Sequence, residues 1–405
     1  ESSLGLVGSE MCIRDSNCLT NGRMRRRFMS EPAMAAYAPL LAERAPEGAV
    51  VLRRRAYQPP VRERERERRV ISANGVCAPT SEPRVFTLSN GVYHAFITET
   101  GLMRSAAGGV MLYRGFEDAL HGPAGLRFRL HTGGKCTELL PVPGTVNGRF
   151  NYRLRGGVLR FDGEADGFEC SHTAGVSARE LGEVRIVEIR PRAALRGELT
   201  LEFEPSLARE ADWASHPAYW RLGLTAKVRD GMLLIRRLAR GGMGGCWLCV
   251  ACDAPAEWRA NLDGEPLGAL SRPYVTARVA LNIRAGGSAR VRFALAFAAT
   301  EDEAAASAQR TLHAGAAQLS DLVSALGAVY GLGGEHLDSM PDIAGRILFP
   351  RVESSAPCAR EELWACGISG DYPIAAARVS ELTPAAIASI SARHALMRIC
   401  GVRAD

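Results

Sequence analysis

The sequence has no apolar run of about eighteen residues, and this absence excludes an ordinary transmembrane helix. It also lacks a basic stripe interleaved with aromatic residues. Its 50 basic and 44 acidic residues are spread along most of the chain and leave a net charge of only +6. No nucleic-acid partner is therefore expected. Eleven cysteines occur without regular spacing, which argues against a disulfide framework and favours a reducing, cytoplasmic location.

The composition is that of a soluble globular protein. Hydrophobic residues make up 47% of the 405 residues, and charged residues make up 23%. The chain is longer than one ordinary hydrophobic core requires. Two or three domains are therefore expected.

The N-terminal part divides into two segments before any strand pattern begins. The string "EMCIRDS" resembles one translated frame of a transposase mosaic-end oligonucleotide used in sequencing libraries, so residues 1–17 are expected to be a disordered artefact on a gene fragment. Residues 18–82 are interpreted as the helical tail of a preceding domain followed by a charged linker. Within them, Ser30 as an N-cap and Pro46 as a stop signal predict a helix over 31–44.

A period of two dominates residues 83–299. In "ELTLEFEP", Leu199, Leu201 and Phe203 alternate with polar residues, as in a half-buried strand. The same alternation flanks a Gly-Gly turn in "VTARVALNIRAGGSARVRFALAF". The pair Asp-Gly at positions 230–231 predicts a type I′ hairpin turn, because both central positions of that turn need a positive φ. About eleven strands without an intervening helical pattern predict a mainly β fold, a large antiparallel sandwich.

Three cysteines in "GGCWLCVACDA", Cys246, Cys249 and Cys252, have the spacing of iron–sulfur cluster ligands. The apolar residues around them predict a short buried strand, and a strand turns Cys249 away from the face of Cys246. They are therefore interpreted as small buried hydrophobes, and no metal site is predicted. His394 is interpreted as a packed histidine, since no second His or Cys pairs with it at helical spacing.

Helical patterns return at Thr300, which forms a capping box with Glu303. An apolar stripe then continues to Gly331 and predicts a helix, and a second short helix is expected over 337–347. Residues 300–347 are interpreted as a helical linker.

A last helix is predicted to start at Thr383 and Pro384 and to end at Gly401. Its expected buried stripe consists of Ile387, Ile390, Met397 and Cys400.

Three strings carry a resemblance to a known family. They are "LSNGVYHAFITETG" (88–101), "SHPAYWRLGLTA" (215–226) and, above all, "LFPRVESSAPCAREELWACGISGDYPI" (348–374). Residues 18–405 resemble glycoside hydrolase family 94, formerly glycosyltransferase family 36, and in particular the phosphorylase-like C-terminal part of bacterial cyclic β-1,2-glucan synthases. The resemblance implies a galactose mutarotase-like β-supersandwich, a helical linker, and an (α/α)6 barrel that begins near residue 348 and is truncated at 405.

The resemblance also implies a chemistry. Members of the family are inverting phosphorylases, in which inorganic phosphate is the co-substrate and a single carboxylic acid protonates the glycosidic oxygen. No cofactor is implied. The family's acid is the Asp of a "DWND"-like string that does not occur here, so no catalytic residue is assigned and the chain alone is expected to be inactive. The expected ligand is a β-glucan or oligosaccharide, with the missing barrel supplied in cis.

Two further expectations concern the parent protein. A homodimer is compatible with the family. The location is cytoplasmic, or the cytoplasmic side of the inner membrane if the chain is part of a large synthase.

The resemblance assigns sugar binding to Asp371, with Gly370 and Ser369 of the same "GISGD" loop. A glycine-rich loop lets the backbone approach a ligand, and a fixed carboxylate accepts hydrogen bonds from sugar hydroxyls. The alternative is that Asp371 caps the turn that follows. Ala365 and Cys366 stand where the family often has an Arg and an aromatic or His residue, so either the sugar contact differs here or the subsite is weakened.

Tyr219 and Trp220 are a second candidate for sugar contact, through ring stacking. However, "AYWRLGLT" alternates as a strand, and a strand buries one of two adjacent aromatic residues, so core packing is the favoured interpretation. Two other functions stay open: a noncatalytic glycan-binding or scaffolding module, and a free-standing sandwich enzyme such as a sugar epimerase. The epimerase would need His and Glu residues that converge, and no carboxylate pairs at strand spacing with His94, His172 or His216.

Overall fold

The protein is represented by a computed structural model. The residues it describes are 70–78, 82–115, 125–141, 148–165, 167–239, 242–261, 273–350, 364, 372–376 and 383–404. The chain divides into two compact units, and one of them, residues 66–351 with 376–404, contains nearly all of the described residues. Several predictions lie outside the described residues, namely those for 1–17, the helix over 31–44, Ala365, Cys366, Ser369, Gly370 and Asp371.

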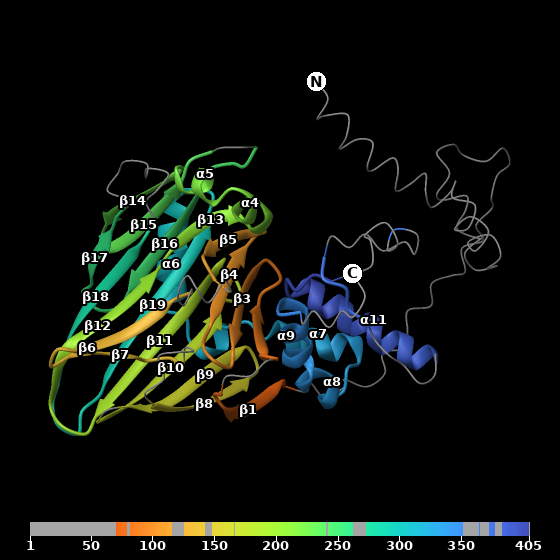
Figure 1. The fold of residues 1–405 in the computed structure, drawn as a ribbon, viewed down its shortest axis with the longest axis horizontal. Helices are drawn as coiled ribbons and strands as arrows, with labels where there is room; N and C mark the ends of the chain where they lie inside the picture. Colours follow the sequence, from red (N-terminus) through yellow and green to blue (C-terminus); the bar gives the residue numbers. More distant parts are fainter. Residues whose placement is uncertain are drawn as a thin grey trace, which may run out of the picture. The chain divides into compact units, whose positions relative to one another are not determined.

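Within the described residues, nineteen strands form three antiparallel sheets (Figure 1). Sheet A has nine strands in the order β1-β8-β9-β10-β11-β19-β16-β15-β14; sheet B has five, β13-β5-β4-β3-β2; sheet C has five, β17-β18-β12-β6-β7. The strands are β1 (Ser72–Val76), β2 (Val85–Ser89), β3 (Tyr93–Thr98), β4 (Met103–Ala107), β5 (Val110–Tyr113), β6 (Arg127–Thr132), β7 (Lys135–Glu138), β8 (Gly148–Arg155), β9 (Val158–Ala165), β10 (Phe168–Val176), β11 (Gly182–Pro191), β12 (Leu195–Phe203), β13 (Pro205–Arg209), β14 (Leu224–Arg229), β15 (Met232–Arg237), β16 (Cys246–Cys252), β17 (Glu257–Ala260), β18 (Val275–Ile283) and β19 (Ala289–Ala298).

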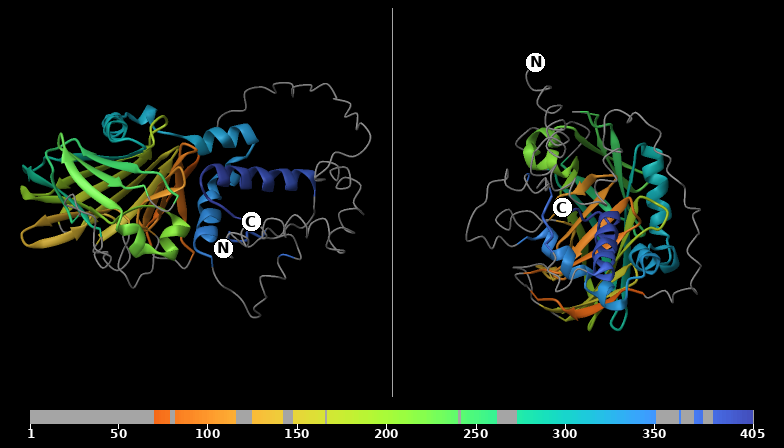
Figure 2. Two further views of the ribbon diagram at one scale, coloured as in Figure 1. Left: turned by 90° about the horizontal axis from the view of Figure 1, so that it is seen from above. Right: turned by 90° about the vertical axis from the view of Figure 1, so that its right-hand side faces the viewer.

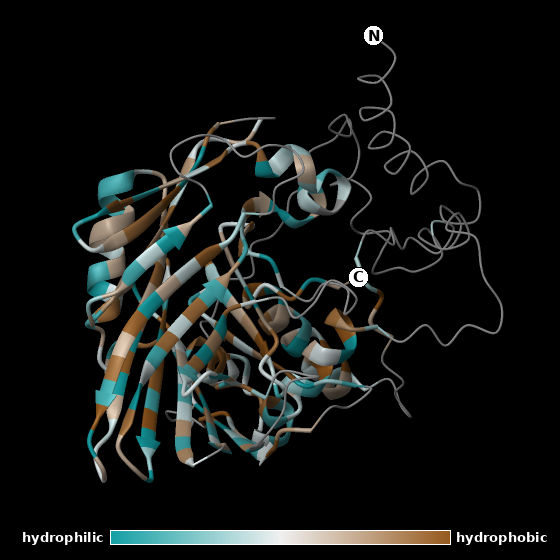
Figure 3. Ribbon diagram, turned by 60° about the vertical axis from the view of Figure 1, so that its left-hand side comes forward, coloured by the Kyte–Doolittle hydropathy of each residue, from teal (hydrophilic) through white to brown (hydrophobic). Residues whose placement is uncertain are grey.

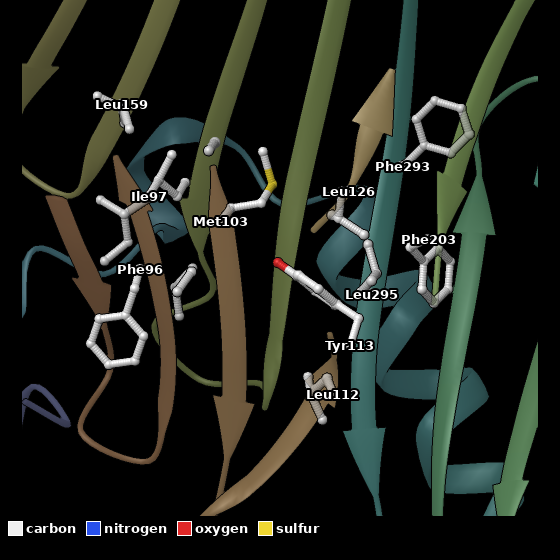
Figure 4. Packing of buried hydrophobic residues seen from close by; sticks show 14 of the residues in the cluster. Phe96, Ile97, Met103, Leu112, Tyr113, Leu126, Leu159, Phe203, Phe293 and Leu295 are labelled. Carbon is white, nitrogen blue, oxygen red and sulfur yellow. The ribbon is translucent and has the colours of Figure 1, made fainter. Parts of the chain in front are cut away.

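Sheet A packs face to face with both smaller sheets. The ring of Phe128 on β6 lies 5.8 Å from that of Phe293 on β19, which joins sheet C to sheet A. The ring of Phe86 on β2 lies 4.9 Å from that of Tyr152 on β8, which joins sheet B to sheet A. In Figure 4 apolar side chains from several strands meet between the sheets. The predicted mainly β supersandwich is confirmed.

The alternation that predicted the strands is visible along the ribbons as hydrophilic and hydrophobic bands (Figure 3). The β14–β15 hairpin turns at Asp230 and Gly231, whose φ angles are +52° and +74°, as a type I′ turn requires. The sheet begins earlier than residue 83, because β1 pairs with β8. The last strand, β19, lies in the middle of sheet A, between β11 and β16.

Helix α6 (Glu301–Leu312) covers part of the outer face of sheet A. The hydroxyl of Thr300 caps it by accepting a hydrogen bond from the Glu303 amide at 3.4 Å. The alanines on its buried side pack on small residues of β19 and β16 and form a second, smaller core. Its members include Ala294, Ala296, Ala304 and Ala308.

The helix predicted to continue to Gly331 is wrong as a single element. A short 3-10 turn, η3 (Ala316–Gln318), follows α6, and α7 (Leu322–Tyr330) then ends at Gly331, whose φ is +67°. The break has a physical cause in the sheet. Ser320 donates its backbone N–H to the carbonyl of Val176 at 2.8 Å, so the chain pairs with the end of β10 instead of with its own preceding turn.

Among the described residues, three more helices lie beside sheet B: α8 (Gly334–Asp338), α9 (Met340–Leu348) and α11 (Pro384–Ile399). In Figure 2 the blue helices lie next to the orange strands. Arg84, just before β2, pairs with Asp342 of α9 at 2.7 Å. Met397 of α11 and its C-cap Cys400 are buried, but Ile387 is 47% exposed, so the predicted stripe is wrong for the N-terminal half. The fully buried positions of α11 fall only in its C-terminal half, and its N-terminal half is exposed or half-buried.

Candidate functional site

The structure places the two predicted aromatic contacts on a helix. Residues 217–221 form α5 (Pro217–Arg221) after α4 (Glu210–Ser215), so the strand expected at this point is wrong. Trp220 is buried, with the Arg237 guanidinium 4.1 Å from its ring centre, whereas Tyr219 is 39% exposed. Only the Tyr219 ring is therefore presented to solvent. The other predicted sugar contact, Asp371, lies outside the described residues.

The candidate site is a polar groove of about 350 Å³ on the outer face of sheet A. It lies across β8, β9, β10 and β11, on the part of the face that the second core under α6 does not include. Strand alternation puts the polar side chains of these strands on one face and the core residues on the other. We call it the β8–β11 groove, and its polar lining residues are Arg149, Asn151, Arg160, Asp162, Glu164, Glu169, Ser171, Glu188 and Arg190.

Cross-strand pairing brings the centre of the groove together. Ser171 of β10 lies opposite both Asp162 of β9 and Glu188 of β11. Arg160 contacts Asp162 at 2.7 Å and Glu188 at 3.5 Å, and Glu188 also accepts a hydrogen bond from Ser171 at 3.3 Å. Arg290 of β19 contacts the other Glu188 oxygen at 3.3 Å. These side chains are thus held in place before any ligand arrives.

A second charged cluster lies on the strands of sheet C, but it is closed. Glu138 is held by Arg127 and Arg129, and Glu202 by Arg129 and by the Tyr274 hydroxyl at 2.5 Å. The two carboxylate side chains are only 8% and 10% exposed, against 43% for Asp162 in the groove. Burial and the hydrogen bond to Glu202 raise the pKa of Tyr274. This cluster therefore offers little free bonding capacity to a ligand.

A third polar cluster lies inside the sandwich. Glu183 and Arg185 of β11 are fully buried and paired at 2.5 Å, and Glu183 also accepts hydrogen bonds from Ser105 at 2.9 Å and Tyr113 at 3.2 Å. Figure 4 shows the Tyr113 side chain among the core residues. Burial, with Arg185 adding to it, lowers the pKa of nearby His172 well below its ordinary value. Because none of these groups reaches solvent, the cluster is structural.

The three cysteines with cluster-like spacing lie on β16, as predicted. Cys246 faces the main core and Cys249 the second core under α6. Burial raises the pKa of each thiol, to about 11 for Cys246 and about 12 for Cys249 and Cys252. In the described part of the chain no three His, Cys, Asp or Glu residues gather as metal ligands. Nor does any helix in that part have the length and apolarity to cross a bilayer.

With the three sheets described, a comparison with known families becomes informative. Residues 70–265 match the family model of the glycosyl hydrolase 94 supersandwich domain. The glycosyl hydrolase 94 match covers β1 to β17 and ends before β18. It supports the family resemblance read from the sequence, while the narrower likeness to cyclic β-1,2-glucan synthases stays a prediction. No curated protein sequence matches the chain.

Several solved structures match parts of the chain at low identity. One is a protein from the human microbiome described as a kojibiose phosphorylase, with 9% identity, a TM-score of 0.42, and coverage of 70% of this chain and 41% of that one. A bacterial glucoamylase in complex with acarbose has 9% identity, a TM-score of 0.41, and coverage of 69% and 44%. An aldose epimerase homologue from C. elegans has 12% identity, a TM-score of 0.33, and coverage of 54% and 100%. The chain thus spans less than half the length of the first two proteins.

Sequence reasoning did not find the β8–β11 groove. The local signal was present, since Arg160, Asp162 and Glu164 alternate along one strand with apolar or small residues. What makes a site of them is the register with the neighbouring strands, which aligns Asp162, Ser171 and Glu188 across three strands. That register depends on long-range pairing and cannot be read from one strand alone.

Proposed function

We propose that the chain is part of a glycoside phosphorylase-like enzyme that acts on β-linked glucans, and that the supersandwich is a noncatalytic domain of it. The match of residues 70–265 to the glycosyl hydrolase 94 supersandwich domain carries this proposal. Contacts that hold helices α7 and α9 against the sandwich support the proposal. Ile71 donates its N–H to Ser324 of α7 at 2.9 Å, and Arg84 pairs with Asp342 of α9. These helices would lead from the sandwich into a catalytic barrel.

In the whole protein, inorganic phosphate would be the co-substrate, and no further cofactor would be needed. Phosphate attacks the anomeric carbon in such a reaction while a carboxylic acid protonates the leaving oxygen. We propose that Asp371, with Gly370 and Ser369, accepts hydrogen bonds from the hydroxyls of the non-reducing sugar. A β-1,2 linkage is the first to test, because the resemblance to cyclic β-1,2-glucan synthases points to it.

The test uses a full-length protein that contains this chain. Release of sugar 1-phosphate is measured with inorganic phosphate and either β-1,2-gluco-oligosaccharides or cellobiose. The Asp371→Asn variant keeps the side-chain shape but turns half of the carboxylate into a donor that faces hydroxyl donors. A hydrogen bond to a charged acceptor contributes about 1.5–3 kcal/mol, so kcat/KM should fall about tenfold to a few hundredfold.

The matched control is Asp230→Asn in the β14–β15 turn, where Asn tolerates the positive φ and turnover should not change. Near-normal turnover by Asp371→Asn, with an unchanged melting temperature, would return Asp371 to a turn-capping role. Absence of phosphorolysis on every β-glucan tried would contradict the proposed enzyme. Binding of β-glucan without turnover would instead support a noncatalytic glycan-binding module.

A further inference from the structure

The β8–β11 groove has the volume of a small-molecule site and a polar lining. Its volume of about 350 Å³ falls in the range of roughly 300–1,000 Å³ that small-molecule sites occupy. Neighbouring strands lie about 4.8 Å apart, so the four strands β8 to β11 give a bed about 14 Å across. This is long enough for a short oligosaccharide and too long for a single small ion.

The charges of the lining select the ligand class. Three guanidinium groups, on Arg149, Arg160 and Arg190, face four carboxylates, on Asp162, Glu164, Glu169 and Glu188. Guanidinium groups and carboxylates are thus mixed along the lining, although Glu164 and Glu169 lie opposite each other, and the net charge of the lining is close to zero. Arg290 and Arg192 pair with Glu188 and Glu164 at the edge of this lining, so neither sign of charge dominates, and neither an anion such as phosphate nor a strongly cationic ligand is favoured. A neutral ligand with many hydroxyl groups fits, because each hydroxyl can donate to a carboxylate and accept from a guanidinium.

The side chains at the centre of the bed are already ordered. Glu188 is fixed by Arg160, by Arg290 and by the Ser171 hydroxyl, and Asp162 is fixed by Arg160. A ligand that binds across them avoids much of the entropic cost of fixing long side chains. Asn151 of β8 is exposed at the rim and adds an amide that both donates and accepts.

We infer that the β8–β11 groove is a second carbohydrate-binding site, made of residues other than Asp371 and its neighbours in sequence, that holds a neutral oligosaccharide stretch by hydrogen bonds. The choice of a β-glucan within this class rests on the proposed function. Among the described lining residues none is aromatic, so stacking contributes nothing and the affinity should be modest. Such a site would keep a long glucan on the protein while one end reacts elsewhere.

The test measures the binding of β-1,2- and β-1,4-linked glucotetraose to the full chain by isothermal titration calorimetry. Glu188→Gln removes the charge at the centre of the bed, and Asn151→Ala removes a polar group at the rim without touching any ion pair described above. Each should weaken Kd about fivefold or more, because each removes hydrogen bonds to the ligand. The matched control is Glu198→Gln on β12, a carboxylate of sheet C in an ion pair with Arg278 at 3.7 Å, which should leave Kd within about twofold.

The outcomes separate this inference from the proposed function. Unchanged oligosaccharide binding in both groove variants would overturn the inference, whatever the enzyme assay shows. Loss of binding in the groove variants supports it even if the full-length protein shows no phosphorolysis, a result that would sink only the proposed enzyme. Binding of inorganic phosphate that the groove variants weaken, in place of oligosaccharide, would also overturn it.

Discussion

Glu183→Gln is the substitution that should most clearly show what holds sheets A and B together. The change is nearly isosteric, but it leaves the Arg185 guanidinium inside the sandwich without its carboxylate. Both side chains are essentially inaccessible to solvent, and the Nε and Nη1 atoms of Arg185 have no hydrogen-bond partner among the described residues. The guanidinium therefore has no second acceptor of comparable strength at hand.

The size of the effect follows from this burial. Removing one partner of a buried ion pair typically costs about 3–5 kcal/mol, because the remaining charge stays desolvated. Arg185→Met should cost less than Glu183→Gln, since the Glu183 carboxylate keeps the hydroxyls of Ser105 and Tyr113 as donors. The double variant removes both charges at once. Its cost should fall short of the sum of the single costs by about 2 kcal/mol or more.

The free energy of unfolding is measured by urea titration at pH 7, with tryptophan fluorescence and circular dichroism followed together to check that the transition is a single one. Glu257→Gln is the matched control, because Glu257 pairs with Arg259 at 2.8 Å and both side chains are about 60% exposed. That control should change stability by less than about 1 kcal/mol. A Glu183→Gln cost as small as that of the control, or strictly additive single costs, would refute the reasoning.

Two more predictions concern acid stability and close packing. His172 is neutral in the folded protein because burial lowers its pKa, and the unfolded chain binds a proton near pH 6.5, so the contribution of His172 to stability should be constant above that pH and fall below it. The melting temperature should therefore drop between pH 7 and pH 5, and His172→Leu should reduce that drop; an equal drop in the variant would contradict the assignment. Gly345→Ala would normally stabilise a helix, but here the new Cβ would meet the Pro83 carbonyl oxygen at 1.8 Å and push α9 off the sheet. A loss of several degrees in melting temperature is expected, against no change for Gly244→Ala, where nothing lies within 4 Å.

The strands could be predicted because their signals are local. The alternation around residues 199–203 and 275–297 arises whenever one face of a strand is buried. The Asp-Gly pair at 230–231 is typical of a type I′ turn. The error at 217–221 arose because the same spacing also suits a short helix. Pro217 begins that helix, and Trp220 is buried against Arg237, a partner 17 positions away that the local pattern does not show.

The candidate site was harder to predict than the fold. Its centre needs three strands in one register, and it lies on the part of the sheet A face that the second core under α6 does not include. Both conditions are tertiary. The Asp371 loop, by contrast, was found through a motif, and its role stays a prediction.

The central position of β19 decides when this protein can fold during synthesis. The two parts of sheet A cannot join until residues 289–298 have left the ribosome, because β19 lies between β11 and β16 and neither of these strands has another partner on that side. Until then β11 and β16 each present an unpaired edge on the nascent chain. Unpaired strand edges favour pairing with other chains. The last strand of the sandwich is thus the one that joins the two parts of sheet A. A gene segment that ends at position 265, where the family match ends, would encode β1 to β17 without β19, the strand that joins β11 to β16.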